Sequence, residues 1–176
     1  MKIGFCGTMS VGKTTLVNKL KLTKEFAHYY FMTERSKYLN SIGIPLNTDS
    51  TLIGQTIFLS ERCRELLYKD VITDRTVIDV MAFTLNASSI SYNDKHSFEN
   101  YAKLLIAEYD YIFYVSPEGI EIEDNGIRET NAEYRETIDK TINKLIYTYQ
   151  PLINNLITIS GTTEERIAKI KETIFG

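Results

Sequence analysis

The sequence contains no tryptophan, and its 176 residues include only three prolines, nine glycines, two cysteines and two histidines. So few glycines and prolines exclude collagen-like and low-complexity chains. Two cysteines are too few for a framework of disulfide bonds, so we expect Cys6 and Cys63 to be reduced. His28 and His96 are isolated, and the sequence has neither a CxxC pair nor a Ser-His-Asp arrangement, so we expect no metal cluster and no triad.

Long apolar runs are also lacking. None approaches the roughly 20 residues of a membrane-spanning helix, and the short N-terminal run stops at glycine and threonine, unlike a signal peptide. We therefore expect a cytoplasmic protein that makes no membrane contact. Neither sign of charge dominates, because 20 Lys and Arg against 23 Asp and Glu give a formal net charge of −3. This slightly acidic balance argues mildly against a dedicated nucleic-acid binder.

Short apolar runs alternate with longer helical patterns, and no repeat or linker interrupts them. With 43% apolar residues the chain can build one sizeable core, so we expect residues 1–176 to form one domain. The expected strands are residues 2–6, 29–32, 71–73, 111–115 and 156–159, and the expected helices are 13–22, 49 onward, 77–86, 97–108 and those capped by Thr130/Glu133 and Thr162/Glu165.

This alternation predicts an α/β fold with a five-stranded parallel sheet flanked by helices on both faces, in three layers. The helix that begins near residue 49 is expected to bury an apolar stripe running from Leu52 and Ile53 to Leu66 and Leu67. Ligands of such sheets bind outside the carboxyl ends of the strands. The segments that follow those ends are residues 7–15, 33–35, 74–75 and 116 onward.

Residues 7–14 read G-T-M-S-V-G-K-T, which fits the phosphate-binding pattern G-x-x-x-x-G-K-[ST] without a mismatch. The motif follows an expected strand and opens an expected helix, a context that favours a phosphate loop over a glycine-punctuated turn. We expect Lys13, on the solvent side of the loop, to bridge the β- and γ-phosphates, and the Thr14 hydroxyl to hold Mg²⁺. The residues expected to bind the nucleotide are Gly7, Thr8, Met9, Ser10, Val11, Gly12, Lys13, Thr14 and Thr15.

Two pairs of charged residues follow other expected strands. Asp74 should face the phosphate loop and could hold Mg²⁺ through water; alternatively, it caps the next helix. Arg75 could clamp a phosphate or lie at the surface. Glu34 could take the proton from an attacking hydroxyl, or be an acid in the first turn of a helix; Arg35 adjoins it.

A polar loop follows the expected strand 111–115, and we expect residues 117–136 to form a lid. Arg128 and Arg135 are seven residues apart, about two helical turns, so both can face one side and neutralise charge on a transferring phosphoryl group. The alternative is a solvated helix start with ion pairs. Between Glu118 and Glu136 there are seven acids and two arginines, net −5, which would repel a nucleic-acid backbone.

The chain resembles P-loop kinases of the nucleoside and nucleotide class. It is most similar to NadR-type ribosylnicotinamide kinase domains and related small AAA-like P-loop kinases of phages and bacteria. Residues 7–14, 33–35, 49–55, 73–76 and 124–128 with Arg135 carry the resemblance, and Asp74-Arg75-Thr76 is closer to the signature of thymidylate and deoxynucleoside kinases. The resemblance implies a P-loop NTPase fold, ATP, Mg²⁺, a lid with Arg128 and Arg135, and acceptor contacts near Glu34, Asp49, Gln55 and Asp74. From their positions we also expect Arg35 and Arg75 to bind the acceptor.

These observations favour a phosphotransferase that moves the γ-phosphoryl group of ATP to a nucleoside, a nucleotide or a related hydroxyl, with Lys13, Asp74, Glu34, Arg128 and Arg135 as catalytic residues. Alternatives are a kinase of a hydroxymethylated base in DNA, which the acidic lid disfavours, a P-loop ATPase or GTPase switch, and a non-catalytic nucleotide-binding module. No Asn-Lys-x-Asp guanine motif occurs. We expect a monomer or a homodimer.

Overall fold

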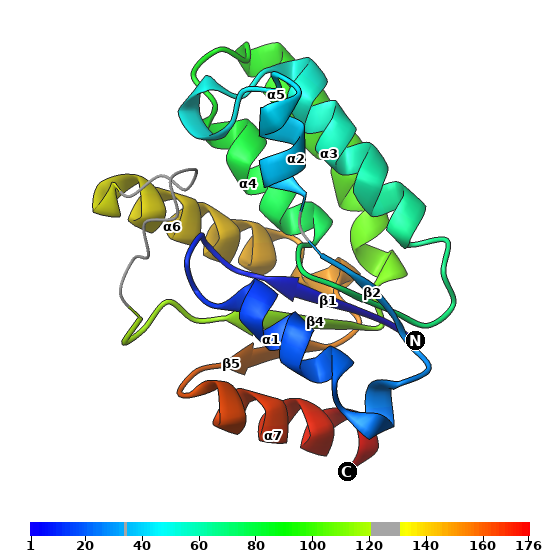
Figure 1. Ribbon diagram of the computed structural model, residues 1–176. Coiled ribbons are helices and arrows are strands. Elements are labelled where there is room, and N and C mark those ends of the chain that lie inside the picture. The colour runs from blue at the N-terminus through cyan, green and yellow to red at the C-terminus, as the bar shows by residue number, and fades with distance from the viewer. Residues whose placement is uncertain (34, 121–130) are drawn as a thin grey trace.

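Five parallel strands form the central sheet of the computed structural model, which describes residues 1–33, 35–120 and 131–176. Their order is β2-β3-β1-β4-β5, and every neighbouring pair is parallel (Figure 1). This confirms the predicted fold class. The strands are β1 (Lys2–Cys6), β2 (Tyr30–Met32), β3 (Val71–Thr73), β4 (Tyr111–Val115) and β5 (Leu156–Ile159).

Side chains of the two central strands alternate between two apolar cores, one on each face of the sheet. Phe5 and Phe113 stack with ring centroids 5.5 Å apart and pack with Leu16 on one face. Cys6 and Ile112 belong to the core on the other face. Because both faces are covered, the strands are continuous apolar runs rather than alternating ones, as parallel sheets require.

Helices cover both faces of the sheet (Figure 1). The helices α1 (Lys13–Lys21) and α7 (Thr163–Phe175) lie on one face, while α4 (Val77–Asn86) and α6 (Ala132–Thr148) lie on the other, with α3 (Leu52–Glu65) and α5 (Tyr92–Ala102) beyond them. The short α2 (Ser36–Ser41) was not predicted. Short 3₁₀ helices are η1 (Lys24–Phe26), η2 (Asn47–Asp49), η3 (Lys103–Glu108) and η4 (Gln150–Leu152).

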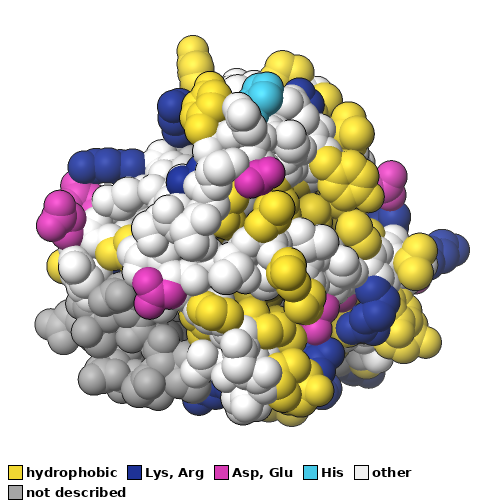
Figure 2. Space-filling model, turned by 90° about the horizontal axis from the view of Figure 1, so that it is seen from above, with side chains coloured by type: hydrophobic (Ala, Val, Ile, Leu, Met, Phe, Trp, Pro, Cys, Tyr) yellow, Lys and Arg dark blue, Asp and Glu magenta, His cyan; other side chains and the backbone are white. Residues whose placement is uncertain are grey.

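The face of the molecule that carries the outer helices exposes both apolar and charged side chains. Viewed from above, hydrophobic groups lie between Lys, Arg, Asp and Glu side chains on this face (Figure 2). Ile42, Ile53 and Tyr92 are among the exposed hydrophobic residues. In the described part of the chain, no helix has the length and hydropathy needed to cross a membrane.

The predicted stripe of α3 is wrong in part. Leu66 is buried, but Ile53 is 75% and Leu67 83% exposed, and the buried face instead contains Phe58 and Arg62. The reason is an internal ion pair: Arg62 lies 2.6 Å from Glu65, so a charged side chain can occupy the core face. The predicted helix 97–108 is also divided, into α5 and η3.

Capping boxes were predicted at the starts of two helices, α6 and α7, and one of them is present. The Thr162/Glu165 capping box at the start of α7 is confirmed. At the start of α6 the cap is Asn131, whose side chain accepts hydrogen bonds from the backbone N–H groups of Glu133 and Tyr134. Thr130, the predicted cap, lies outside the described residues.

Candidate active site

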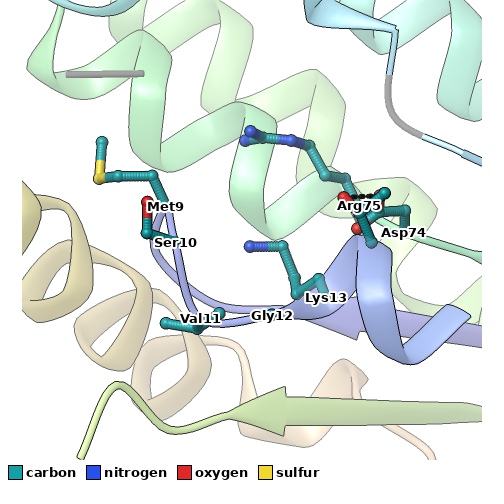
Figure 3. Close-up of a pocket in the computed structure, with 8 residues that line it drawn as sticks. Met9, Ser10, Val11, Gly12, Lys13, Asp74 and Arg75 are labelled. Atoms are coloured by element: carbon teal, nitrogen blue, oxygen red, sulfur yellow. Dashed lines mark hydrogen bonds between the residues drawn. The ribbon is translucent and has the colours of Figure 1, made fainter. Parts of the chain in front are cut away.

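The phosphate motif forms the loop between β1 and α1, at the carboxyl edge of the sheet. Gly12 has φ +83°, a left-handed conformation that favours glycine, and a Cβ on Gly7 would lie 2.7 Å from the Val115 carbonyl oxygen. Both glycines are therefore required by the backbone rather than by flexibility alone. The loop residues 9–14 line a pocket together with Asp74 and Arg75 (Figure 3).

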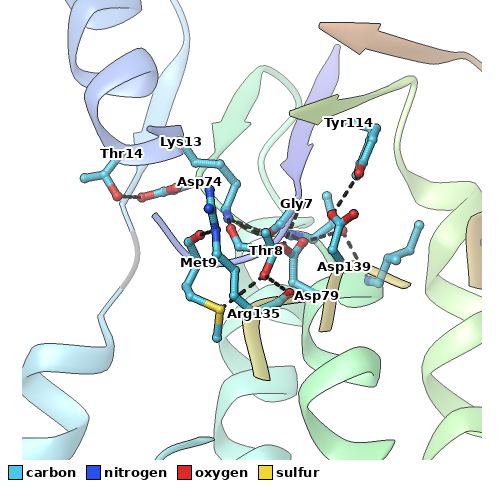
Figure 4. Close-up of polar contacts among 12 residues, drawn as sticks. Gly7, Thr8, Met9, Lys13, Thr14, Asp74, Asp79, Tyr114, Arg135 and Asp139 are labelled. Atoms are coloured by element: carbon cyan, nitrogen blue, oxygen red, sulfur yellow. Dashed lines mark hydrogen bonds and ion pairs between the residues drawn. The ribbon is translucent and has the colours of Figure 1, made fainter. Parts of the chain in front are cut away.

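Lys13 points back into the loop. Its Nζ donates to the carbonyl oxygens of Gly7, at 2.5 Å, and Thr8, at 2.7 Å, and the side chain is only 6% exposed (Figure 4). The expectation that Lys13 lies on the solvent side is wrong, because these carbonyls bind the ammonium group inside the loop. Burial lowers the pKa of Lys13, and the charge of Arg75 adds to this, while Asp79 and Asp74 oppose it.

Asp79 is a site residue that the sequence reasoning missed. It is fully buried on α4; its Oδ1 accepts from the backbone N–H of Gly7 at 3.1 Å and lies 3.9 Å from Nζ of Lys13. Its Oδ2 accepts from the backbone N–H and the hydroxyl of Thr76, at 2.8 and 2.9 Å. Asp79 thus ties the phosphate loop to the start of α4. The T-x-x-D spacing of a capping box was the available signal.

Thr14 and Asp74 lie in direct contact across the carboxyl edge. The Thr14 hydroxyl donates to Oδ2 of Asp74 at 2.6 Å, and Asp74 is 1% exposed. The cap of α4 is Thr76, so the alternative in which Asp74 caps this helix is wrong. Asp74 instead contributes a buried carboxylate to the pocket that the phosphate loop lines.

These two side chains fit a magnesium ion. Mg²⁺ binds hard oxygen ligands, keeps several waters, and is usually held by one or two protein groups plus phosphate oxygens. A hydroxyl and a carboxylate beside a phosphate loop are such a set. The described residues contain no group of three or more His, Cys, Asp or Glu side chains that could hold a metal ion.

Arg75 and Arg135 supply positive charge at the same place. Arg75 is half-buried, lines the pocket, and holds its guanidinium carbon 5.0 Å from the centre of the Phe83 ring. Arg135, at the start of α6, donates from Nε to the Met9 carbonyl at 3.2 Å and from Nη1 to the Ile120 carbonyl at 2.9 Å. Its Nη2 is buried and has no hydrogen-bond partner among the described residues.

A polar network joins α6 to β4 beside the loop (Figure 4). The Tyr114 hydroxyl donates to Oδ1 of Asp139 at 2.8 Å and accepts from Nδ2 of Asn143 at 2.9 Å. Burial raises the pKa of Asp139, while its hydrogen bond from Tyr114 and the charges of Arg135 and Lys13 oppose the rise. Sequence reasoning missed this network because its members are ordinary residues of a strand and a helix.

The structure gathers some predicted site residues and separates others. Lys13, Thr14, Asp74, Arg75 and Arg135 lie around the phosphate loop. The expected acceptor residues Arg35, Asp49 and Gln55 do not line the pocket: Arg35 binds Oε1 of Glu61 at 2.9 Å, Asp49 is exposed in η2, and Gln55 is buried on α3. Their roles stay predictions.

Glu34, Arg128 and most of the expected lid lie outside the described residues. Of the lid, residues 117–120 and 131–136 are described, and they include Ile120 and Arg135, which contact each other. The lid as a whole and the roles of Glu34 and Arg128 therefore stay predictions.

The phosphate loop, the strand order of the sheet and the buried carboxylate of Asp74 beside the loop define a P-loop protein with the fold of nucleoside and nucleotide kinases. A family model described as an AAA domain matches residues 2–166, and the chain belongs to this family. No curated protein matches the chain.

Solved structures share the fold at low identity. A deoxyadenosine kinase from M. mycoides, with products dCMP and a flexible dCDP bound, has a TM-score of 0.69 and 16% identity over 99% of this chain and 98% of that chain. Its dATP-bound form has a TM-score of 0.62 and 17% identity over 100% of each chain. The YorR protein of Bacillus subtilis, in complex with phosphorylated GDP, has a TM-score of 0.52 and 17% identity over 98% and 94%. The predicted resemblance is confirmed at the level of the fold, but NadR-type kinases in particular are not among these matches.

Proposed function

We propose that this protein is an ATP- and Mg²⁺-dependent kinase that transfers the γ-phosphoryl group to a nucleoside, a nucleotide or a related small hydroxyl acceptor. The observation that carries the proposal is the Thr14–Asp74 contact beside Lys13, within a complete phosphate loop. Solved proteins of the same fold hold dCMP, dATP and a guanine nucleotide, which supports an acceptor or donor of this chemical class.

The donor triphosphate would bind in the phosphate loop. Backbone N–H groups of the phosphate loop would surround its oxygens, and the N-terminus of α1 would add positive partial charge. Lys13 would exchange its bonds to the loop carbonyls for bonds to the β- and γ-phosphate oxygens. The exchange is favourable because a charged oxygen accepts more strongly from an ammonium group than a carbonyl does.

Thr14 and Asp74 are the residues that would hold the metal beside the triphosphate. When bound, Mg²⁺ neutralises charge on the β- and γ-phosphate oxygens and orients them for transfer. Thr14 would contribute its hydroxyl oxygen, and Asp74 would contribute its carboxylate directly or through water. The burial of Asp74 holds this carboxylate at one position, which limits the reorganisation needed at each turnover.

In the transfer step the acceptor oxygen attacks the γ-phosphorus, and the bond from that phosphorus to the β–γ bridging oxygen breaks. The acceptor proton would go to Glu34, and ADP leaves with the bridging oxygen. We propose Arg35, Asp49, Gln55 and Arg75 as the acceptor contacts.

Arg135 and Arg128 would stabilise the negative charge that spreads over the transferring group. Arg135 already reaches the phosphate loop, and its Nη2, which has no hydrogen-bond partner in the described part of the chain, is a donor that a phosphate oxygen could satisfy. Arg128 would act from the lid. Their contribution is greatest in the transition state, where the charge to be stabilised is most widely spread.

Release of ADP, measured with and without acceptors, tests the proposal. The panel contains nucleosides, nucleoside monophosphates and DNA with a hydroxymethylated base. A kinase releases little ADP until one acceptor is added. Rapid release without any acceptor would instead support an ATPase switch, and nucleotide binding without turnover under every condition would support a binding module. Transfer to the DNA would identify a nucleic-acid acceptor in spite of the acidic lid.

A further inference from the structure

A second arginine contacts the phosphate loop from α7, on the opposite face of the sheet from α4, whose Asp79 lies beside Lys13. Arg166, in the first turns of α7, is 4% exposed, and its Nη1 donates to the Val11 carbonyl oxygen at 2.8 Å. A Cβ on Gly12 would lie 3.6 Å from this nitrogen. The guanidinium group therefore packs on the back of the loop, 155 residues away in the sequence from the carbonyl it binds.

The charge of Arg166 is not compensated by the described residues. Its Nε and Nη2 are buried without hydrogen-bond partners, and the ion pairs among residues 1–33, 35–120 and 131–176 do not include it. The neighbouring acids are engaged elsewhere: Glu164 pairs with Lys19, and Glu165 bonds the start of its own helix. Burial lowers the pKa of Arg166, as expected for a cation without a nearby acid.

Arg62 is a second buried arginine of this protein, and unlike Arg166 it forms an ion pair. It is 1% exposed and lies 2.6 Å from Glu65, which is also buried. That partner raises the pKa of Arg62 against the effect of burial. Burying a charge destabilises a folded protein unless an opposite charge lies beside it. No described acid pairs with Arg166, so its burial must have another reason.

The Val11–Gly12 peptide links Arg166 to the ligand side of the loop. In a trans peptide the C=O and the N–H point in opposite directions. Because Arg166 holds the Val11 carbonyl behind the loop, the N–H of Gly12 is directed to the other side. A hydrogen bond to the carbonyl also polarises the peptide and strengthens the N–H as a donor.

We propose that Arg166 is a positioning residue of the phosphate site, whose buried charge is compensated by the phosphates of a nucleotide bound on the opposite side of the loop. This inference rests on the proposed function. It makes Arg166 unfavourable for the stability of the protein alone and favourable for nucleotide affinity. These opposite effects on stability and on nucleotide affinity distinguish Arg166 from a residue that only packs α7 against the loop.

The test compares Arg166→Met, which keeps much of the volume, and Arg166→Gln with Arg166→Lys, which keeps the charge. Lys19→Met is the matched control, because Lys19 is an exposed cation of α1 that pairs with Glu164 of α7, the helix that carries Arg166. Calorimetry measures the affinity for adenosine, AMP, ADP and a non-hydrolysable ATP analogue. Thermal unfolding measures each variant without ligand.

We expect the Met and Gln variants to lose affinity for the ATP analogue on the order of 10- to 100-fold, from the loss of a charge acting through a low-dielectric loop. The loss should grow from AMP to ATP and be absent for adenosine. Arg166→Lys should retain most of the affinity, and Lys19→Met should match the wild type. Without ligand, the midpoint of unfolding of Arg166→Met should equal or exceed that of the wild type.

Two results would overturn the inference while leaving the proposed function intact: wild-type affinity in Arg166→Met, or a lower unfolding midpoint in that variant with equal losses for every ligand. A wild-type protein that binds no nucleotide would instead contradict the proposed function, and this inference with it.

Discussion

The hydroxyl of Thr14 donates to the carboxylate of Asp74 at 2.6 Å, although 60 residues separate them in the sequence. Thr14 ends the phosphate motif and lies in the first turn of α1. Asp74 follows β3, the strand beside β1. Parallel pairing of β1 with β3 brings their carboxyl ends to one edge, so the contact is a consequence of the strand order. The proposed kinase chemistry depends on this contact.

Replacing Asp74 should show whether its charge holds the metal. In Asp74→Asn we expect the rate of transfer to fall on the order of 100-fold or more, and the Mg²⁺ concentration needed for half-maximal rate to rise, because a neutral amide binds Mg²⁺ weakly. The measurement is a Mg²⁺ titration of the initial rate. Glu108→Gln is the control, since Glu108 is an exposed acid paired with Lys2. An unchanged titration in Asp74→Asn would remove Asp74 from the metal site.

Lys13 should matter for both turnover and stability. Lys13→Met keeps the apolar stem but removes the ammonium group, so we expect transfer to be abolished. The variant also leaves the carbonyls of Gly7 and Thr8 without this donor and the buried Asp79 without its nearby cation, which should lower the free energy of unfolding by about 1–3 kcal/mol. Initial rates and denaturant unfolding check the two effects. Wild-type transfer in the variant would disprove the phosphate-loop assignment.

Much of the fold could be predicted from the sequence because its signals are local. The strands β1 and β4 are short apolar runs that are followed directly by a glycine and a serine. The phosphate loop is specified by eight consecutive residues. The contacts that complete the site are not local. Asp79 binds Gly7 across 72 residues, and Arg166 binds Val11 across 155, so neither role is visible before the strands are ordered.

The errors have the same origin. The buried position of Lys13 follows from its hydrogen bonds to the carbonyls of Gly7 and Thr8, which the motif as a string of residues does not reveal. The buried face of α3 contains Arg62, which an apolar pattern would exclude, because Glu65 neutralises it one turn later. Residue periodicity records hydrophobicity but not such pairing.

Arg135 should affect the chemical step more than ATP binding. In Arg135→Ala we expect kcat to fall on the order of 10- to 100-fold while KM for ATP changes less, because the charge that Arg135 stabilises is greatest in the transition state. Arg128→Ala should behave in the same way. Lys140→Ala, which removes an exposed cation of the same helix, is the control for steady-state kinetics. An unchanged kcat in both arginine variants would show that neither arginine contributes to transfer.

Asp139 should make stability depend on pH. Burial raises its pKa in the folded protein above the ordinary 3.8, so as pH rises through this interval the unfolded chain loses its proton first and the free energy of unfolding falls. Asp139→Asn cannot titrate and can still accept from Tyr114. Relative to the wild type, the variant should therefore gain stability as pH rises from below 3.8 to neutrality. Denaturant unfolding at several pH values checks this, and a difference that stays constant with pH would contradict it.

The most direct test of the kinase proposal follows the γ-phosphoryl group itself. ATP labelled at the γ-phosphate is incubated with Mg²⁺ and the acceptor that stimulates ADP release, and the label in the product is measured. The proposal predicts one labelled acceptor for each ADP formed by the wild type, and none above background with Lys13→Met. Label released only as inorganic phosphate, or the same yield from both proteins, would contradict it.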